Sequence, residues 1–321
     1  MLANAQIIKR VVEEMGGVFE EVIPERNCYY IHIKKRAFII TRQFRIVRNF
    51  ISIADSTKFK DLTYTLLRRN SLPTPETVFF FRKKPGDIAK KLGNIKFPII
   101  VKDSSGSNSI GIFPYIKNMV EAKRVINNNL PKFHSLVAQE MIFGTEYRLL
   151  TLGNKIIGAL EMIPPRVLGD GKSTVEELIK EKQKILKKKT PIDEALKKIV
   201  KEQGFTLKQI LPFGKLVSIK RNSSLAEGGE TRDVTDLVHK NTAALCVKAS
   251  DATGNYLAGL DVICDDITLD PSKQNFGILE INGKPDIYIH YNPTHGKPRN
   301  VVKDIVNFVV KIGATKKSKN V

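Results

Sequence analysis

Apolar positions recur along the chain in two patterns, one typical of helices and one typical of strands. Residues 5–15 repeat apolar residues at helical spacing and stop at Gly16-Gly17, which predicts a helix. The predicted helices are 5–15, 59–69, 117–129, a basic helical segment that begins at about 174, 238–253 and 301–312. The predicted strands are 18–23, 28–33, 37–44, 97–103, 136–142, a hairpin over 146–163 that turns at Gly153-Asn154, 215–224, 256–264 and 276–282.

The order of these elements predicts an α/β (α+β) chain with mixed sheets rather than alternating βαβ units, so a Rossmann fold is not expected. The first helix and the three strands after it predict a small N-terminal α/β cap over residues 1–55. Ser173 and Glu176 have the spacing of a capping box, which places a helix start at about 174. Residues 225–236 are polar and contain Gly228-Gly229, and they are predicted to form a loop.

Composition indicates an ordinary folded protein. The chain has 321 residues, of which 42% are hydrophobic and 27% are charged, and its length allows about two domains. The N-terminus lacks the uninterrupted apolar region of a signal peptide, and nowhere do about 18 apolar residues run together. We therefore expect a cytoplasmic protein without a membrane partner. The three cysteines are far apart and predict neither a disulfide framework nor a zinc site.

A formal net charge of +20 predicts attraction to polyanions. The sign alone does not choose between nucleic acid, an anionic membrane, nucleotides and acidic peptides. Much of the excess lies in residues 181–189 and in the C-terminal tail, and such runs are typical of solvated helix faces and chain ends.

Three oxygen-bearing residues lie in two apolar strand segments. Glu280 and Asn282 are two positions apart, so both side chains leave their strand on one face. Asp261 lies in the apolar segment AGLDVIC. If the two strands pair, these oxygens converge, and oxygen donors without His or Cys suit Mg²⁺. The alternative is that both carboxylates form ion pairs with nearby Lys or Arg side chains.

Two further segments suit the binding of an anion. Lys102 ends a buried strand and precedes the small, polar stretch SSGSNSIGIF, whose backbone amides can close over a phosphate. Arg221 and Asn222 precede a loop containing Gly228-Gly229, where an Arg can stabilise phosphoryl charge. Each segment alone is also consistent with an ordinary surface loop. Together with the carboxylates they indicate a nucleotide and Mg²⁺ centre.

With these motifs the sequence resembles the ATP-grasp superfamily, and within it the ATP-grasp modules of cyanophycin synthetases and bifunctional glutathione synthetases. The resemblance runs from about Ile53 to Arg299 and is dense in PPRVLGDGKSTVEELI, KRNSSLAEGGETRDVTDLVH, AGLDVICDDI and ILEINGKPDIYIHYNPTHGKPR. It implies two α+β subdomains that hold ATP between them. The implied division is a cap over 1–55, an N-terminal subdomain with anion loop and hinge over 56–145, and a C-terminal subdomain with the Mg²⁺ site and acceptor loops over 146–321.

The resemblance also implies roles for single residues. Phosphate binding falls on Lys60 and Lys102, with Ser107 and Gly111 in the anion loop. Gln139, Glu140, Met141 and Ile142 correspond to the hinge that holds adenine, and Glu146 to the acidic residue on the ribose. Asp261, Glu280 and Asn282 match the metal ligands, Arg221 and Asn222 the catalytic loop, and His290 lies near the acceptor end. The chain departs from the pattern at Ser109, Met162 and Gln139, which replace a common Gly, Arg and acidic residue.

The implied activity is that of an ATP-dependent carboxylate–amine ligase that forms an amide bond of the peptide or γ-glutamyl type. ATP and Mg²⁺, with Mn²⁺ as a substitute, are the expected cofactors. The expected partners are a small carboxylate donor and an amine acceptor, an amino acid or short peptide, and a homodimer is a family-based expectation. We expect a stand-alone ligase. The alternatives are a basic nucleic-acid-binding protein, disfavoured because the chain has no Trp and residues 181–189 contain no aromatic residue, and a non-catalytic ATP-binding protein.

Overall fold

The computed structural model divides into two compact units. Unit 1 comprises Met1–Ala159, Val234–Asn292 and Pro298–Val321, and unit 2 comprises Leu160–Asp233 and Pro293–Lys297. The structure describes residues 3–23, 28–34, 36–41, 57, 60–84, 86–104, 111–186 and 191–314. In these ranges no helix is both long and apolar enough to cross a membrane. The division at residues 55 and 145, which follows function rather than compactness, stays a prediction.

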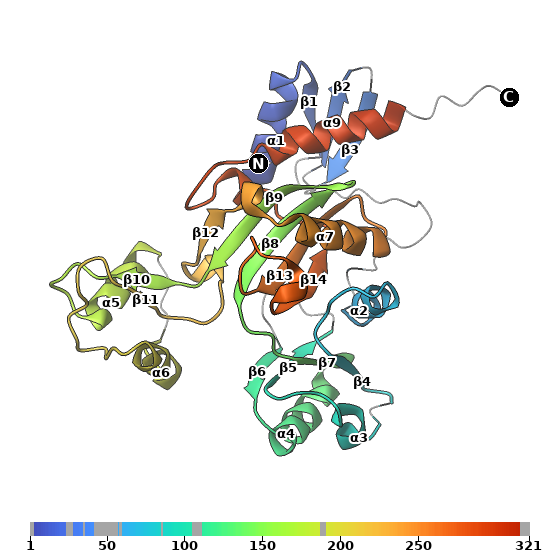
Figure 1. Cartoon of the computed structure of the whole chain (residues 1–321). Coiled ribbons are helices and arrows are strands. Elements are labelled where there is room, and N and C mark those ends of the chain that lie inside the picture. Colours follow the sequence, from blue (N-terminus) through green and yellow to red (C-terminus); the bar gives the residue numbers. More distant parts are fainter. Residues whose placement is uncertain are drawn as a thin grey trace. The chain divides into compact units, whose positions relative to one another are not determined.

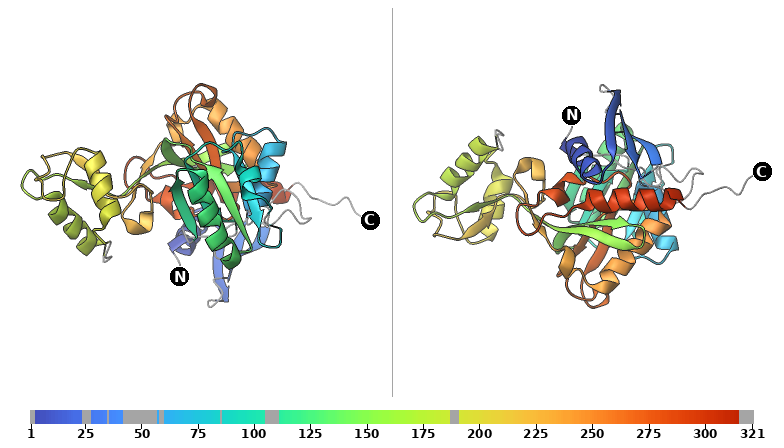
Figure 2. Two further views of the ribbon diagram at one scale, coloured as in Figure 1. Left: turned by 90° about the horizontal axis from the view of Figure 1, so that it is seen from below. Right: turned by 90° about the horizontal axis from the view of Figure 1, so that it is seen from above.

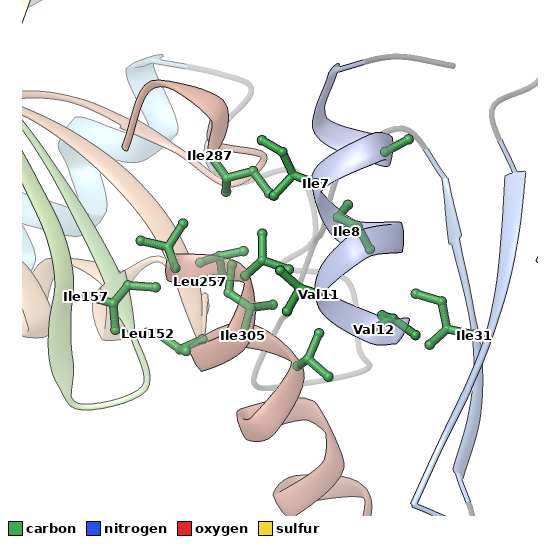
Figure 3. Packing of buried hydrophobic residues seen from close by; sticks show 14 of the residues in the cluster. Ile7, Ile8, Val11, Val12, Ile31, Leu152, Ile157, Leu257, Ile287 and Ile305 are labelled. Carbon is green, nitrogen blue, oxygen red and sulfur yellow. The ribbon is translucent and has the colours of Figure 1, made fainter. Parts of the chain in front are cut away.

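The N-terminal elements share a core with the rest of unit 1. Helix α1 (Ala3–Glu14) precedes an antiparallel sheet of β1 (Val18–Ile23), β2 (Cys28–Ile33) and β3 (Arg36–Thr41). Ile7, Ile8, Val11 and Val12 form the predicted apolar face of α1 (Figure 3). They lie in one buried cluster with residues of β2, β8 (Thr145–Leu152), β9 (Lys155–Ile163), β13 (Leu257–Cys264) and α9 (Val301–Ala314). The closing helix α9 lies beside α1, as Figure 1 and the right view of Figure 2 show. The first and last helices of the described residues are therefore packed together.

An antiparallel four-stranded sheet carries the first set of site residues. Its order is β4 (Thr77–Phe81), β7 (Ser135–Glu140), β5 (Ile99–Asp103) and β6 (Ile112–Ile116). Ile99 and Val101 pack with α3 (Ile88–Leu92) and α4 (Met119–Asn129) in a buried cluster. Because side chains alternate between faces, Lys102 and the paired strand's Gln139 point away from these helices. Strands β4 and β6 were not among the elements predicted from the sequence.

A second sheet of unit 1 carries the carboxylates. Its strands are β9 (Lys155–Ile163, which continues into unit 2), β8 (Thr145–Leu152), β13 (Leu257–Cys264) and β14 (Phe276–Asn282), in that order. The predicted turn between β8 and β9 is confirmed, and Gly153 has a φ of +62° there. Helices α2 (Lys60–Arg69) and α7 (Lys240–Ala252) contribute buried residues to one cluster with β8, β13 and β14. Short α8 (Tyr288–Tyr291) follows β14.

Unit 2 has a small core of its own. Strands β10 (Arg166–Leu168) and β11 (Leu216–Ser218) pair antiparallel, and α5 (Val175–Ile185) and α6 (Glu194–Glu202) supply most of the remaining buried residues. The predicted strand over 215–224 is therefore wrong beyond Ser218. The predicted loop over 225–236 contains β12 (Glu230–Asp233), which pairs with Leu160–Ile163 of β9. The hydrogen bonds of β12 depend on β9, which is distant in the sequence, so local sequence does not predict this strand.

The helix start in unit 2 differs by one residue from the predicted capping box. Thr174, not Ser173, is the N-cap of α5, and it exchanges hydrogen bonds with Glu177 in a complete capping box. The Ser173 hydroxyl instead donates to Asp170 Oδ2 at 2.7 Å. Both Ser-x-x-Glu and Thr-x-x-Glu occur in the overlapping sequence STVEE, so spacing alone could not choose between them.

Candidate functional site

Strands β13 and β14 bring the three predicted metal ligands to one face of their sheet. Asp261 lies directly opposite Glu280, and Asn282 lies opposite Gly259, two residues from Asp261. Directly opposed residues project to the same face, as do residues two apart along a strand. The donor set is two carboxylates and one amide, which suits a hard divalent cation that shares its remaining coordination with phosphate oxygens. Across the described ranges, no group of three His, Cys, Asp or Glu residues is close enough to hold a metal ion.

Each carboxylate is held by a basic side chain. Arg148 of β8 donates to Asp261 through Nε at 2.7 Å and Nη2 at 3.0 Å, and Lys60 Nζ lies 3.3 Å from Glu280 Oε1. Burial raises the pKa of Asp261, while the Arg148 guanidinium opposes that shift. The structure therefore shows the ion pairs that the sequence analysis left open as an alternative. A metal role for these residues stays a prediction.

Lys102 lies near the same two carboxylates. It is partly buried at the end of β5, and burial lowers its pKa, against the opposing effect of Glu280 and Asp261. Among the described residues, three cations, Lys60, Lys102 and Arg148, thus lie around the Asp261 and Glu280 carboxylates, and Glu146 acts electrostatically on Arg148 as well. Three basic side chains gathered in this way offer charged donors to an anionic ligand such as phosphate.

The predicted anion loop is described only at its two ends. Ser107 and Ser109 lie outside the described residues. Gly111 has a φ of +73°, and its carbonyl accepts from the Asp103 amide at 3.0 Å, closing the loop. A Cβ at this position would come within 3.0 Å of the Phe133 ring, so both conformation and space favour glycine.

The predicted hinge follows β7, and its side chains are engaged in packing. Gln139 is buried at 2% exposure and donates to Thr77 Oγ1 at 3.1 Å. Met141 Sδ accepts from the Tyr115 amide at 3.3 Å. Ile142 packs so close to Gly277 of β14 that a Cβ there would come within 2.3 Å of it. These contacts fix the path of residues 139–142, whereas their role toward adenine stays a prediction.

Residues 140 and 146 complete the described part of the predicted nucleotide site. The Glu140 amide donates to the Glu76 carbonyl at 2.9 Å, at the end of β7. Glu146 lies opposite Ile263 on β8, two residues from Arg148 and so on the face that carries Asp261. The hinge therefore leads directly into the strand that supplies Arg148.

The predicted catalytic pair belongs to unit 2. Arg221 and Asn222 lie in the turn after β11, and Arg221 forms an ion pair with Glu202 at the end of α6. Nearby, Lys220 pairs with Glu227, and Gly228 has a φ of +90°. Met162, also in unit 2, is buried opposite Thr231. The roles of Arg221 and Asn222 stay predictions.

His290 is packed against the sheet of unit 1. It is buried at 1% exposure, and a Cβ at Gly158 would come within 2.6 Å of its Nδ1. The His290 carbonyl accepts from the Arg299 amide at 2.9 Å. This close packing supports a structural role for the ring.

Sequence reasoning missed two residues of the site, Arg148 and Tyr64. Arg148 interrupts the apolar strand EYRLLTL two positions after Glu146, and this break was the available signal. Tyr64 follows Lys60 by four positions, so both lie on one face of α2. Only the strand and helix packing shows that each faces the carboxylates.

Comparison with known proteins connects this fold with the ATP-grasp proteins. Residues 56–176 match the family model of the RimK-like ATP-grasp domain. The chain is 29% identical over 263 residues to the glutathione biosynthesis bifunctional protein GshAB of Clostridium perfringens, covering 78% of this chain and 33% of that protein. It is 28% identical over 262 residues to the cyanophycin synthetase of Geminocystis herdmanii, covering 78% of this chain and 30% of that protein.

Solved structures agree on the fold. The bifunctional glutathione synthetase from Pasteurella multocida matches with a TM-score of 0.70 at 21% identity, covering 96% of this chain and 43% of that chain. The D-alanine–D-alanine ligase from Bacillus anthracis matches with a TM-score of 0.50 at 12% identity, covering 84% and 70%. The chain therefore has the ATP-grasp fold, as predicted, and its residues 56–176 match the RimK-like ATP-grasp domain. It spans about a third of the length of the curated relatives it matches.

Proposed function

We propose that this chain is an ATP-dependent carboxylate–amine ligase that forms an amide bond of the peptide or γ-glutamyl type. One observation carries the proposal: the three basic side chains of Lys60, Lys102 and Arg148 gather around the Asp261 and Glu280 carboxylates. Such a site suits nucleotide phosphates together with a divalent cation. The names of the relatives, a glutathione biosynthesis protein and a cyanophycin synthetase, support the reaction class.

The proposed reaction has two steps. A carboxylate oxygen of the donor attacks the γ-phosphorus of ATP, the bond to the β-phosphate oxygen breaks, and ADP leaves. The amine nitrogen of the acceptor then attacks the acyl carbon, the bond to phosphate breaks, and the amine loses a proton as the amide forms. Such phosphoryl transfer depends mainly on positioning and charge stabilisation, so no catalytic triad is needed.

Residues of the chain have distinct tasks in this mechanism. Lys60 and Lys102 bind phosphate oxygens, and Arg221 stabilises charge on the transferring group. Asp261, Glu280 and Asn282 would hold Mg²⁺, which supplies charge neutralisation when bound. Arg148 must then release or share the Asp261 carboxylate, because it now contacts both of its oxygens.

Substrate identity is the finer part of the proposal. The net charge of +20 supports an acidic donor or acceptor, such as an acidic peptide or a γ-glutamyl dipeptide. The decisive experiment measures ADP and phosphate release against amino acids, γ-glutamyl dipeptides and acidic peptides, followed by the mass of the product. A product heavier than the donor by one acceptor minus water is expected. ATP turnover that yields no amide with any member of the panel would contradict the proposal.

A non-catalytic ATP-binding protein is the second candidate, because ion pairs already hold both carboxylates. It predicts that ATP raises the melting temperature, that Glu280→Ala abolishes this stabilisation, and that no phosphate is released. A nucleic-acid-binding protein would instead show a salt-sensitive gel shift without nucleotide turnover.

A further inference from the structure

The side chain of Tyr64 joins α2 to the four-stranded sheet of Lys102 and to the sheet that carries the carboxylates. The residue is buried at 1% exposure, and its hydroxyl donates a hydrogen bond to the Leu279 carbonyl of β14, next to Glu280. One phenol thus connects the helix of Lys60 with the strand of Glu280.

The same hydroxyl contacts Lys102. Lys102 Nζ donates to Tyr64 Oη at 3.4 Å and lies 5.7 Å from the centre of the Tyr64 ring. Tyr64 Oη is therefore a hydrogen-bond acceptor for this ammonium group. The two carboxylates nearby are held by Arg148 and Lys60.

The protonation state of Tyr64 suits this arrangement. Burial raises the pKa of the Tyr64 hydroxyl well above its ordinary range, so the hydroxyl keeps its proton. That single proton is used toward the Leu279 carbonyl. The oxygen therefore acts as an acceptor toward Lys102, and a lysine ammonium is a donor only.

We propose that Tyr64 is a positioning residue, whose hydroxyl holds the Lys102 ammonium at the point where it binds nucleotide phosphate. A lysine side chain has four rotatable bonds and loses considerable freedom when it is fixed, so a partner that fixes it in advance strengthens phosphate binding. The inference rests on the proposed function only in that the anion bound by Lys102 is a nucleotide phosphate.

Calorimetric titration of ADP with Mg²⁺, and of adenosine, tests this role. Tyr64→Phe keeps the ring and removes the hydroxyl. We expect it to weaken ADP binding about fivefold to tenfold, the effect of losing one typical hydrogen bond, and to leave adenosine binding unchanged. In a Lys102→Met background, Tyr64→Phe should have no further effect, because the group that it positions is absent.

The control is Tyr256→Phe, which removes a hydroxyl from a partly buried tyrosine. Tyr256 packs on Phe308 in the cluster that contains α1 and α9, away from the site. It should bind ADP and adenosine as the unaltered protein does. Unchanged ADP affinity in Tyr64→Phe, an equal loss for adenosine, or an undiminished loss in the Lys102→Met background would each overturn the inference.

Two other results, a variant that does not fold and a protein that is inactive, can be distinguished from failure of the inference. If Tyr64→Phe does not fold, 3-fluorotyrosine at position 64 replaces it, since its weaker acceptor oxygen should lower ADP affinity in the same direction, and equal affinity would overturn the inference. Binding is measured without turnover. A protein that binds ADP through Tyr64 and Lys102 but forms no amide would contradict the proposed function and leave this inference standing.

Discussion

Asp261 and Glu280 are carboxylates whose present partners are cations of the chain itself. Opposition of the two residues across β13 and β14 follows from strand pairing, and Asn282 joins them through the two-residue period. This convergence could be predicted from the sequence because each strand is apolar around its polar residues. Arg148 and Tyr64 could not, because their contacts depend on the register of β8 against β13 and on how α2 packs.

Removing the charge of Glu280 separates a metal ligand from an ion-pair partner. Glu280→Gln should weaken ADP binding in Mg²⁺ about tenfold or more, since affinity for divalent cations depends on the number of charged ligands. With a chelator present, the same change should strengthen ADP binding, because the site loses a negative charge. Calorimetry under both conditions gives the two affinities.

The matched control for this experiment is Asp304→Asn. It removes a carboxylate that pairs with Lys155 at 2.9 Å in α9, outside the site. It should change neither affinity. If Glu280→Gln weakens ADP binding equally with and without Mg²⁺, the residue is not a metal ligand.

Individual elements were predicted with unequal success, for physical reasons. The helix over 5–15 and the strand over 276–282 carry complete periodic patterns and match α1 and β14. Strand β12, ETRD, has no apolar alternation, so its own sequence does not identify it as a strand. It is stabilised by pairing with β9, which is distant in the sequence. The start of α5 moved by one residue because two capping sequences overlap. Local sequence could therefore identify amphipathic elements but not those stabilised by distant partners.

Strand β9 and helix α8 constrain each other through Gly158 and His290. Gly158→Ala should destabilise unit 1 by about 1–3 kcal/mol, because the new methyl group overlaps the buried ring. In a Gly158→Ala, His290→Ala double variant the loss should be smaller than the sum of the single losses. Urea unfolding followed by circular dichroism measures these differences.

Gly93→Ala provides the control, because a Cβ there meets its nearest neighbour at an ordinary 3.4 Å. Gly93→Ala should lower the free energy of unfolding by less than Gly158→Ala does. Strictly additive losses at 158 and 290 would show that the two residues do not contact each other.

The turn before α5 has a titratable group with a defined pH range. Hydrogen bonds from the Ser173 and Lys172 amides lower the pKa of Asp170 to about 2 from an ordinary 3.8. Since the folded-state pKa is depressed, the stabilisation is present above about pH 4 and is lost as the pH falls toward 2. Asp170→Ala should therefore lower the stability of unit 2 at pH 6 and have little effect near pH 2.

A tryptophan at position 205 makes this measurement specific to unit 2. The chain has no Trp, and Phe205 packs partly buried against the core of unit 2. Urea titrations of Phe205→Trp with and without Asp170→Ala, followed by fluorescence from pH 2 to 6, give the two stability curves. A constant difference across this range would exclude a role for the Asp170 charge.

At the scale of the whole molecule, the excess of Lys and Arg is the dominant electrostatic property. The formal charge is +20, and charges on exposed surfaces act over about 10 Å at 0.1 M salt. Part of this positive charge lies at the site, where Lys60, Lys102 and Arg148 gather. The remaining positive charge attracts an acidic substrate over a distance, before the substrate reaches its binding site.

Ionic strength should therefore distinguish acidic from neutral substrates. For an acidic acceptor peptide, KM should rise severalfold when NaCl is raised from about 50 to about 300 mM, because screening weakens long-range attraction. A neutral dipeptide of similar length should show little change over the same range. If KM depends equally on salt for both peptides, the salt effect arises from ATP binding or from a general salt sensitivity, and not from attraction of the acidic peptide.

The short segment Pro293–Lys297 belongs to unit 2, although the residues before and after it belong to unit 1. Thr231 and Thr294 hold it to β12 by reciprocal hydrogen bonds of 3.0 Å, and the His295 carbonyl accepts from the Asp233 amide at 2.9 Å. The polypeptide therefore passes from one unit to the other four times, at 159/160, 233/234, 292/293 and 297/298. Excising residues 160–233 would remove the hydrogen-bonding partners of Thr294 and His295, so unit 2 cannot be exchanged between relatives as one uninterrupted segment.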